Sequence, residues 1–311
     1  MSVPVIDVSP LAGSDPARRA ETVASLGDAC RTVGFFAVIG HGIPQHCLDA
    51  AFEASRRLFA LPEPAKLALR GGDMASTNRG YVPLRGERLS ADMPPDVKEA
   101  FNIGPELAPE IAGAPDVHPG TAANLWPDLP AWRSVMLDYL ARCHALGRSL
   151  HRAFAEILGV EADFFEASLK APGSVLRLLH YPGCADGGGT AGAGEHTDYG
   201  NVTILAIDGV AGLQVRDRAG RWIDVSGLEG GFVCNIGDCL MRWSNDIYVS
   251  TPHRVMNPPG RDRYSVAFFL DPNPDVLIDC LPGCHDAGRP KYPPILAADY
   301  LRQRLDATYQ K

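Results

Sequence analysis

The chain has 311 residues, of which 46% are hydrophobic and 21% are charged, and its net charge is −8. This is the composition of a soluble globular protein, and a negative charge without a basic stretch argues against nucleic acid as a partner. The sequence contains no apolar run of about 18 residues, and its first ten residues do not resemble a signal peptide. We therefore expect a cytoplasmic protein that acts on a small molecule and not at a membrane.

Three helices are predicted from capping residues and apolar periodicity. Asp15 can cap a helix that begins at Pro16 and ends before Gly34, where an apolar strand follows. A second amphipathic helix is expected from about residue 131 to 158, and a last one over 297–309. His151 lies on the second helix among apolar neighbours and is interpreted as a packing residue.

The region from Ser174 onward is expected to form a β-rich core, because short β-branched runs alternate there with Gly, Pro and Asp turns. Residues 183–194 include six glycines and are predicted to be a flexible loop leading to His196. A proline-rich break over 105–130 suggests an N-terminal segment, 1–118, and a catalytic region, 119–311, which together form one compact unit.

A metal site is predicted from His196-Thr197-Asp198 and the later His253. On extended backbone the side chains of residues i and i+2 leave the same face, so His196 and Asp198 can converge on one ion. Two imidazoles and one carboxylate can hold one face of an octahedral Fe(II) and leave three positions open. The alternative is a surface histidine beside a turn aspartate, since a His-x-Asp triplet alone is common.

An anion site is predicted from Arg263 and Ser265, which share one face of an otherwise apolar strand over 263–270. A buried guanidinium is too costly without a carboxylate partner. That partner could be an Asp or Glu of the protein, but a bound ligand fits the pattern better.

Five segments together resemble the isopenicillin N synthase-like branch of the Fe(II)/2-oxoglutarate-dependent dioxygenases. They are residues 3–7, 34–44, 96–104, 196–205 and 237–255, so the resemblance extends over nearly the whole chain. It implies a mainly β fold with flanking helices, built on a double-stranded β-helix, or jelly roll. It also implies that His196, Asp198 and His253 bind Fe(II), and that Arg263, Ser265 and Tyr181 bind the cosubstrate 2-oxoglutarate.

The activity implied by this resemblance is the oxidation of a small molecule by O2, most often its hydroxylation, with release of succinate and CO2. Leu179 departs from the family pattern, which often has asparagine at that place. The alternative is a 2-oxoglutarate-independent oxidase that performs desaturation or ring closure, in which Arg263 and Ser265 hold a substrate carboxylate. An intact triad argues against a non-enzymatic binding protein.

The primary substrate is less well indicated. Six residues are candidates for contacting it, and each can equally be read as structural: Arg79, Tyr81, Arg85, Phe101, Trp243 and Tyr248. Arg79 and Arg85 flank a turn-rich segment that could bring a cation to the site, which favours an anionic substrate. The sequence does not indicate an oligomeric state.

Overall fold

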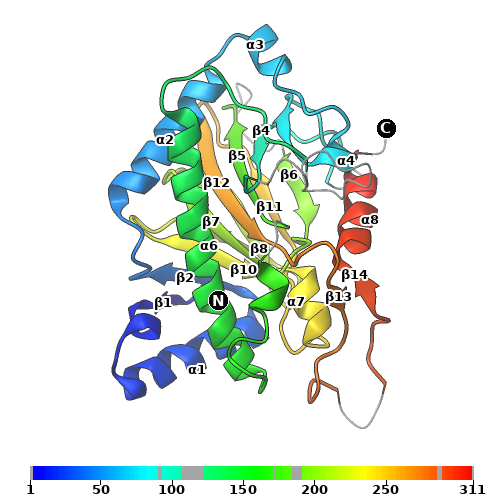
Figure 1. The fold of residues 1–311 in the computed structure, drawn as a ribbon. Coiled ribbons are helices and arrows are strands. Elements are labelled where there is room, and N and C mark those ends of the chain that lie inside the picture. The colour runs from blue at the N-terminus through cyan, green and yellow to red at the C-terminus, as the bar shows by residue number, and fades with distance from the viewer. Residues whose placement is uncertain are drawn as a thin grey trace.

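A computed structural model describes residues 3–89, 93–106, 122–170, 173–183, 191–285 and 289–309. Its centre is a pair of facing β-sheets with helices on the outside (Figure 1). Within the described ranges, no helix combines the length and the apolar character that a membrane span needs. The prediction of a jelly-roll core with flanking helices is confirmed.

The larger sheet has eight strands, in the spatial order β1 (Val5–Asp7), β2 (Phe35–Ile39), β10 (Phe232–Ile236), β7 (Val202–Ile207), β12 (Arg263–Leu270), β5 (Val175–Tyr181), β4 (Glu99–Ile103) and β3 (Gly80–Val82). Only β1 and β2 pair in parallel; the other neighbours are antiparallel. The N-terminal segment therefore supplies both ends of this sheet.

The smaller sheet has four strands, in the order β6 (Ala191–His196), β11 (His253–Met256), β8 (Leu213–Arg216) and β9 (Trp222–Val225). A separate two-stranded ribbon is formed by β13 (Leu277–Ile278) and β14 (Ile295–Leu296).

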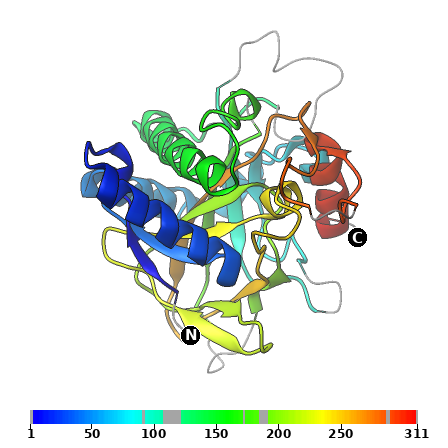
Figure 2. The same cartoon turned by 90° about the horizontal axis from the view of Figure 1, so that it is seen from below.

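The helices are α1 (Pro16–Thr32), α2 (Gln45–Phe59), α3 (Glu63–Leu67), α4 (Met74–Thr77), α6 (Trp132–Ile157), α7 (Asp238–Trp243) and α8 (Ala297–Tyr309), with short 3-10 turns at Ser9–Ala12 and Ala167–Leu169. Figures 1 and 2 show α1, α2 and α6 on one side of the larger sheet, and α8 beside α4 at another edge of the molecule. The Asp15 cap is confirmed, since its side chain accepts hydrogen bonds from Ala17 N and Arg18 N at 3.0 and 3.2 Å.

Strand alternation divides the side chains of the larger sheet between two cores. On β12, Val266, Phe268 and Leu270 belong to the core beneath the helices, whereas Ala267 belongs to the core between the sheets. Because both faces of the sheet are covered, the sequences of its central strands are mostly apolar. On β12 the polar residues Arg263 and Ser265 point into the space between the sheets.

One local prediction is wrong. The glycine-rich stretch 183–194 was expected to be a loop throughout, but Ala191–His196 forms β6; residues 184–190 lie outside the described ranges. Small residues are needed here for close packing, because a Cβ added at Gly192 would lie 1.9 Å from Asn257 Oδ1. Glycine in this strand thus marks a close approach of neighbouring groups.

Candidate metal centre and pocket

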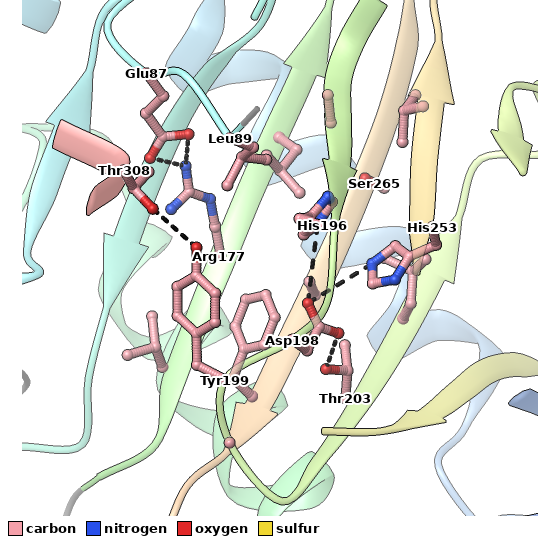
Figure 3. A pocket seen from close by; sticks show the side chains of 18 of the residues that line it. Glu87, Leu89, Arg177, His196, Asp198, Tyr199, Thr203, His253, Ser265 and Thr308 are labelled. Carbon is pink, nitrogen blue, oxygen red and sulfur yellow. Dashed lines mark hydrogen bonds and ion pairs between the residues drawn. The ribbon is translucent and has the colours of Figure 1, made fainter. Parts of the chain in front are cut away.

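The strand register brings the three predicted metal ligands together. His196 ends β6 and His253 begins β11, and these two residues are direct partners in the antiparallel pair. Asp198 follows two residues after His196. Their ligand atoms all lie within 4.8 Å of one another, and the Asp198 Oδ1 atom is 3.9 Å from His196 Nε2 and 3.6 Å from His253 Nε2 (Figure 3). Three donors of this type and spacing fit a divalent metal.

Hydrogen bonds fix the orientation of each ligand. His196 Nδ1 donates to Gly194 O at 2.7 Å, and His253 Nδ1 donates to Thr251 O at 3.2 Å. A histidine that carries its proton on Nδ1 keeps the Nε2 lone pair for a metal. Burial, followed by the nearby His253, lowers the pKa of His196 to about 3, so this imidazole is neutral at pH 7.

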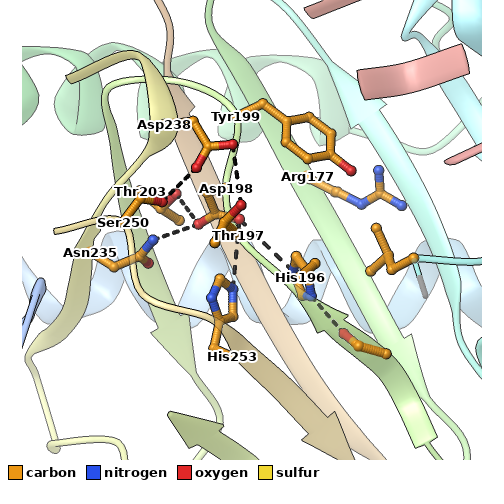
Figure 4. Close-up of polar contacts among 12 residues, drawn as sticks. Arg177, His196, Thr197, Asp198, Tyr199, Thr203, Asn235, Asp238, Ser250 and His253 are labelled. Atoms are coloured by element: carbon orange, nitrogen blue, oxygen red, sulfur yellow. Dashed lines mark hydrogen bonds and ion pairs between the residues drawn. The ribbon is translucent and has the colours of Figure 1, made fainter. Parts of the chain in front are cut away.

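Asp198 is held by side chains of β7 and β10. Its Oδ2 atom accepts hydrogen bonds from Thr203 Oγ1 and from Asn235 Nδ2 at 2.7 Å (Figure 4). Burial alone would raise the pKa of Asp198, but the two histidines and these hydrogen bonds outweigh it and lower the pKa. The carboxylate is therefore charged, with its Oδ1 atom directed at the histidines.

Asp238 joins the two segments that carry the ligands. It is not among the site residues predicted from the sequence. It accepts hydrogen bonds from Thr197 Oγ1 at 3.1 Å and Ser250 Oγ at 2.7 Å (Figure 4). It also accepts one from Tyr300 OH at 2.6 Å. The signal that could have found it is its place in residues 237–255, one of the segments that carry the family resemblance.

Arg263 and Ser265 lie in the same pocket as the metal ligands. The guanidinium of Arg263 is buried, donates from Nε to Val210 O at 3.3 Å and from Nη1 to Ser265 Oγ at 3.5 Å, and lies 4.9 Å from the ring centroid of Tyr181. Among the described residues, no Asp or Glu forms an ion pair with it. A buried cation in this state fits the carboxylate of a bound molecule.

The pocket is lined by residues of both sheets. Its walls include Phe35, Leu205, Phe269 and, from α8, Leu301 and Leu305.

None of the six substrate candidates is among the residues that line this pocket. Arg79 is fully buried and its Nη1 donates to Asn78 O at 2.9 Å, while Arg85 is exposed. These are the two residues on which the expectation of an anionic substrate rested.

The four aromatic candidates lie in the core beneath the helices: Tyr81, Phe101, Trp243 and Tyr248. Phe101 packs edge to face on Trp132 of α6, with ring centroids 5.5 Å apart. Tyr248 donates to Phe154 O at 3.3 Å. Their observed contacts are structural.

Comparison with known proteins identifies the family. Residues 3–129 match the model described as non-haem dioxygenase in morphine synthesis N-terminal, and residues 172–272 match the 2OG-Fe(II) oxygenase superfamily. A 2-oxoglutarate-Fe(II) type oxidoreductase of Emericella nidulans, hxnY, is 37% identical over 98% of this chain and 90% of its own length. The chain belongs to the 2OG-Fe(II) oxygenase superfamily. It is an oxidoreductase that uses Fe(II), 2-oxoglutarate and O2.

Two further relatives carry information on substrates. A homoarginine-6-hydroxylase of Oryza sativa subsp. japonica is 36% identical over 98% of this chain and 96% of its own length. The crystal structure of a full-length Neurospora crassa protein in complex with alpha-KG and thymine has a TM-score of 0.86 and 33% identity, covering 98% of this chain and 96% of the other. These relatives thus take chemically different small molecules.

Proposed function

We propose that this enzyme hydroxylates a small molecule in the pocket between the two sheets. In this proposal His196, Asp198 and His253 hold the iron, and Arg263, Ser265 and Tyr181 hold the distal carboxylate of 2-oxoglutarate. When bound, iron, 2-oxoglutarate and O2 supply the oxidising chemistry, in which one oxygen atom enters the substrate and the other enters succinate, with loss of CO2.

The observation that carries the proposal is the position of Arg263. Its buried guanidinium faces the same pocket as the three metal-ligand atoms and has no acidic partner among the described residues. A dicarboxylate that reaches the metal with one end would place its other carboxylate here. Ser265 adds a hydroxyl donor on the same strand face, and the ring of Tyr181 packs against the guanidinium.

The chain's own residues then position and shield the reactants. Thr203 and Asn235 fix the Asp198 carboxylate, so that the metal geometry does not depend on solvent. Apolar side chains, including Leu205 and Phe269, keep bulk water from the space where the substrate's C–H bond would be oxidised. The polar groups that could select the substrate lie elsewhere in the pocket.

The test is an anaerobic titration of the purified protein with Fe(II) and then with 2-oxoglutarate. We expect a visible metal-to-ligand charge-transfer band that requires both additions. Replacing His196, Asp198 or His253 by Ala should abolish the band and succinate formation while far-UV circular dichroism stays as in the wild type. O2 uptake without succinate would favour the oxidase alternative, and full turnover in any of the three variants would contradict the assigned ligands.

A further inference from the structure

A carboxylate oxygen that receives no hydrogen bond from the described residues lies in the pocket beyond the end of β12. The pocket-facing residues of this strand alternate from Arg263 and Ser265 through Phe269, and the same alternation brings in Asp271 one step after the strand ends. Asp271 is 9% exposed, and no described residue donates a hydrogen bond to its Oδ1 atom.

Asp271 also lies against the segment that follows the metal ligand Asp198. A Cβ added at Gly200, two residues after Asp198, would lie 1.6 Å from Asp271 Oδ1, so the carboxylate packs directly on this backbone. Burial, followed by the negative charge of Asp198, raises the pKa of Asp271 to about 7, although the positive charge of Arg79 acts in the opposite direction. A buried carboxylate oxygen to which no described residue donates is costly, and its presence in a pocket points to a donor on a ligand.

Asn102 on β4 offers a second acceptor in the same pocket. Its side chain is 1% exposed, and its Nδ2 atom donates to Asn78 Oδ1 at 2.7 Å. Its Oδ1 atom is enclosed and has no hydrogen-bond partner among the described residues. Two pocket residues on different strands, Asp271 and Asn102, thus each present an oxygen that lacks a donor.

Arg177 provides the opposite polarity. It is the direct partner of Asn102 in the β4–β5 pair, so both side chains leave the same face of the sheet. Glu87 contacts Arg177 through Nη2 only, with both carboxylate oxygens at 2.6 Å. Figure 3 shows Arg177 and Glu87 together on the side of the pocket away from His253.

The charges around Arg177 balance locally. Lys98 Nζ lies 3.1 Å from Glu87 and 2.5 Å from Asp96, so two cations face two carboxylates. Arg177 is therefore held in place within a cluster in which two cations and two carboxylates are paired. Tyr309 of α8 also donates to Glu87, which ties this cluster to the last helix.

We propose that Asp271 and Asn102 accept hydrogen bonds from the primary substrate and that Arg177 donates one to it. The substrate class that fits is a small polar molecule that carries both N–H donors and a carbonyl or carboxylate oxygen, such as an amino acid with a cationic side chain or a cyclic amide. This inference rests on the proposed function and narrows it.

Binding to the protein loaded anaerobically with Fe(II) and 2-oxoglutarate tests the inference, with isothermal titration calorimetry as the readout. The probes are L-homoarginine, a zwitterion with a guanidinium; thymine, a neutral cyclic imide; and 4-phenylbutyrate, an acid of similar size with no N–H group. We expect L-homoarginine or thymine to bind more tightly than 4-phenylbutyrate. Tighter binding of L-homoarginine indicates a substrate with cationic N–H donors, and tighter binding of thymine indicates one with neutral N–H donors.

Asp271→Asn is the decisive variant, because it keeps the shape and removes the charge. It should weaken the binding of the preferred N–H probe by about ten- to a hundred-fold, as expected for one charge-assisted hydrogen bond. Asn102→Ala should weaken it several-fold. Asp275→Asn is the matched control, since Asp275 is an exposed carboxylate four residues further on, and it should bind as the wild type does.

Two further readouts separate the possible failures. The charge-transfer band should persist in Asp271→Asn, and its absence from the wild type would instead contradict the proposed function. Thermal stability of Asp271→Asn should equal or exceed that of the wild type, because the variant removes a buried charge. The inference is overturned if neither N–H probe binds more tightly than 4-phenylbutyrate, or if Asp271→Asn leaves probe affinity unchanged.

Discussion

At the scale of single residues, the pocket combines groups that the sequence pattern indicates with groups that it does not. His196, Asp198, Arg263 and Ser265 lie at i and i+2 positions on extended backbone, so their convergence could be predicted from strand geometry alone. Asn102 could not be found in this way. It follows Phe101 on β4, and only the tertiary fold decides which of two neighbours faces the pocket.

Arg263→Lys tests the anion site at this scale. A guanidinium can hold a carboxylate with two parallel hydrogen bonds, whereas an ammonium cannot, and such bonds contribute about 1.5–3 kcal/mol each. The 2-oxoglutarate concentration needed for half-maximal succinate formation should therefore rise about ten- to a hundred-fold. Ser265→Ala should have a smaller effect, because one neutral donor is lost.

Metal binding serves as the internal control for both variants and should stay at the wild-type level, since neither residue is a proposed ligand. If both variants bind 2-oxoglutarate as the wild type does while affinity for the primary substrate falls, then Arg263 and Ser265 hold the substrate's carboxylate.

At the scale of elements, the long helix and the last helix are the best predicted parts. The long helix was expected over about 131–158 and is observed as Trp132–Ile157, and the last helix occupies the expected residues 297–309. The strand β6 was missed because its alanines and glycines are chosen for close packing, which a propensity argument cannot detect. Apolar periodicity thus predicts these two helices well, and propensity fails where a strand needs small residues for close packing.

His151 links α6 to the loop that follows the metal ligands, and this contact gives a pH-dependent stability. Its Nδ1 donates to Gly147 O at 2.7 Å, and its Nε2 accepts from Asn201 Nδ2 at 3.1 Å. Burial lowers the pKa of His151 from 6.5 to about 4, so the folded state holds it neutral. Between those two pH values the unfolded state binds more protons, and stability must fall as the pH falls.

We expect this contribution to be complete above pH 6.5 and to decline by about 3 kcal/mol on acidification to pH 4, at about 1.36 kcal/mol per pH unit. Melting temperatures of the wild type and His151→Gln, measured from pH 8 to pH 4, should show a shallower decline for the variant. His46→Gln is the control, since His46 is exposed on α2 and should leave the profile unchanged. Identical slopes for the wild type and His151→Gln would refute this account.

At the scale of the whole molecule, the order of strands explains why one pocket needs nearly the entire chain. Residues before 118 supply β1 and β2 at one end of the larger sheet and β4 and β3 at the other, with the catalytic strands between them. The family resemblance predicts a jelly roll, but composition and spacing do not reveal that the N-terminal segment closes both ends of its sheet. That arrangement depends on long-range pairing, such as β4 with β5 and β2 with β10.

This topology predicts that the chain unfolds as a single cooperative unit and that the region 119–311 does not fold alone. Without residues 1–118, β10 and β5 would become exposed sheet edges with unpaired backbone groups, which promote aggregation. Glu87, the buried partner of Arg177, would also be lost. Calorimetry of the full chain should show one transition, while fragment 119–311 should be insoluble or melt without cooperativity. Co-expression with fragment 1–118 is the control and should restore soluble protein; a fragment 119–311 that is soluble and melts sharply by itself would show that the two regions are separate domains.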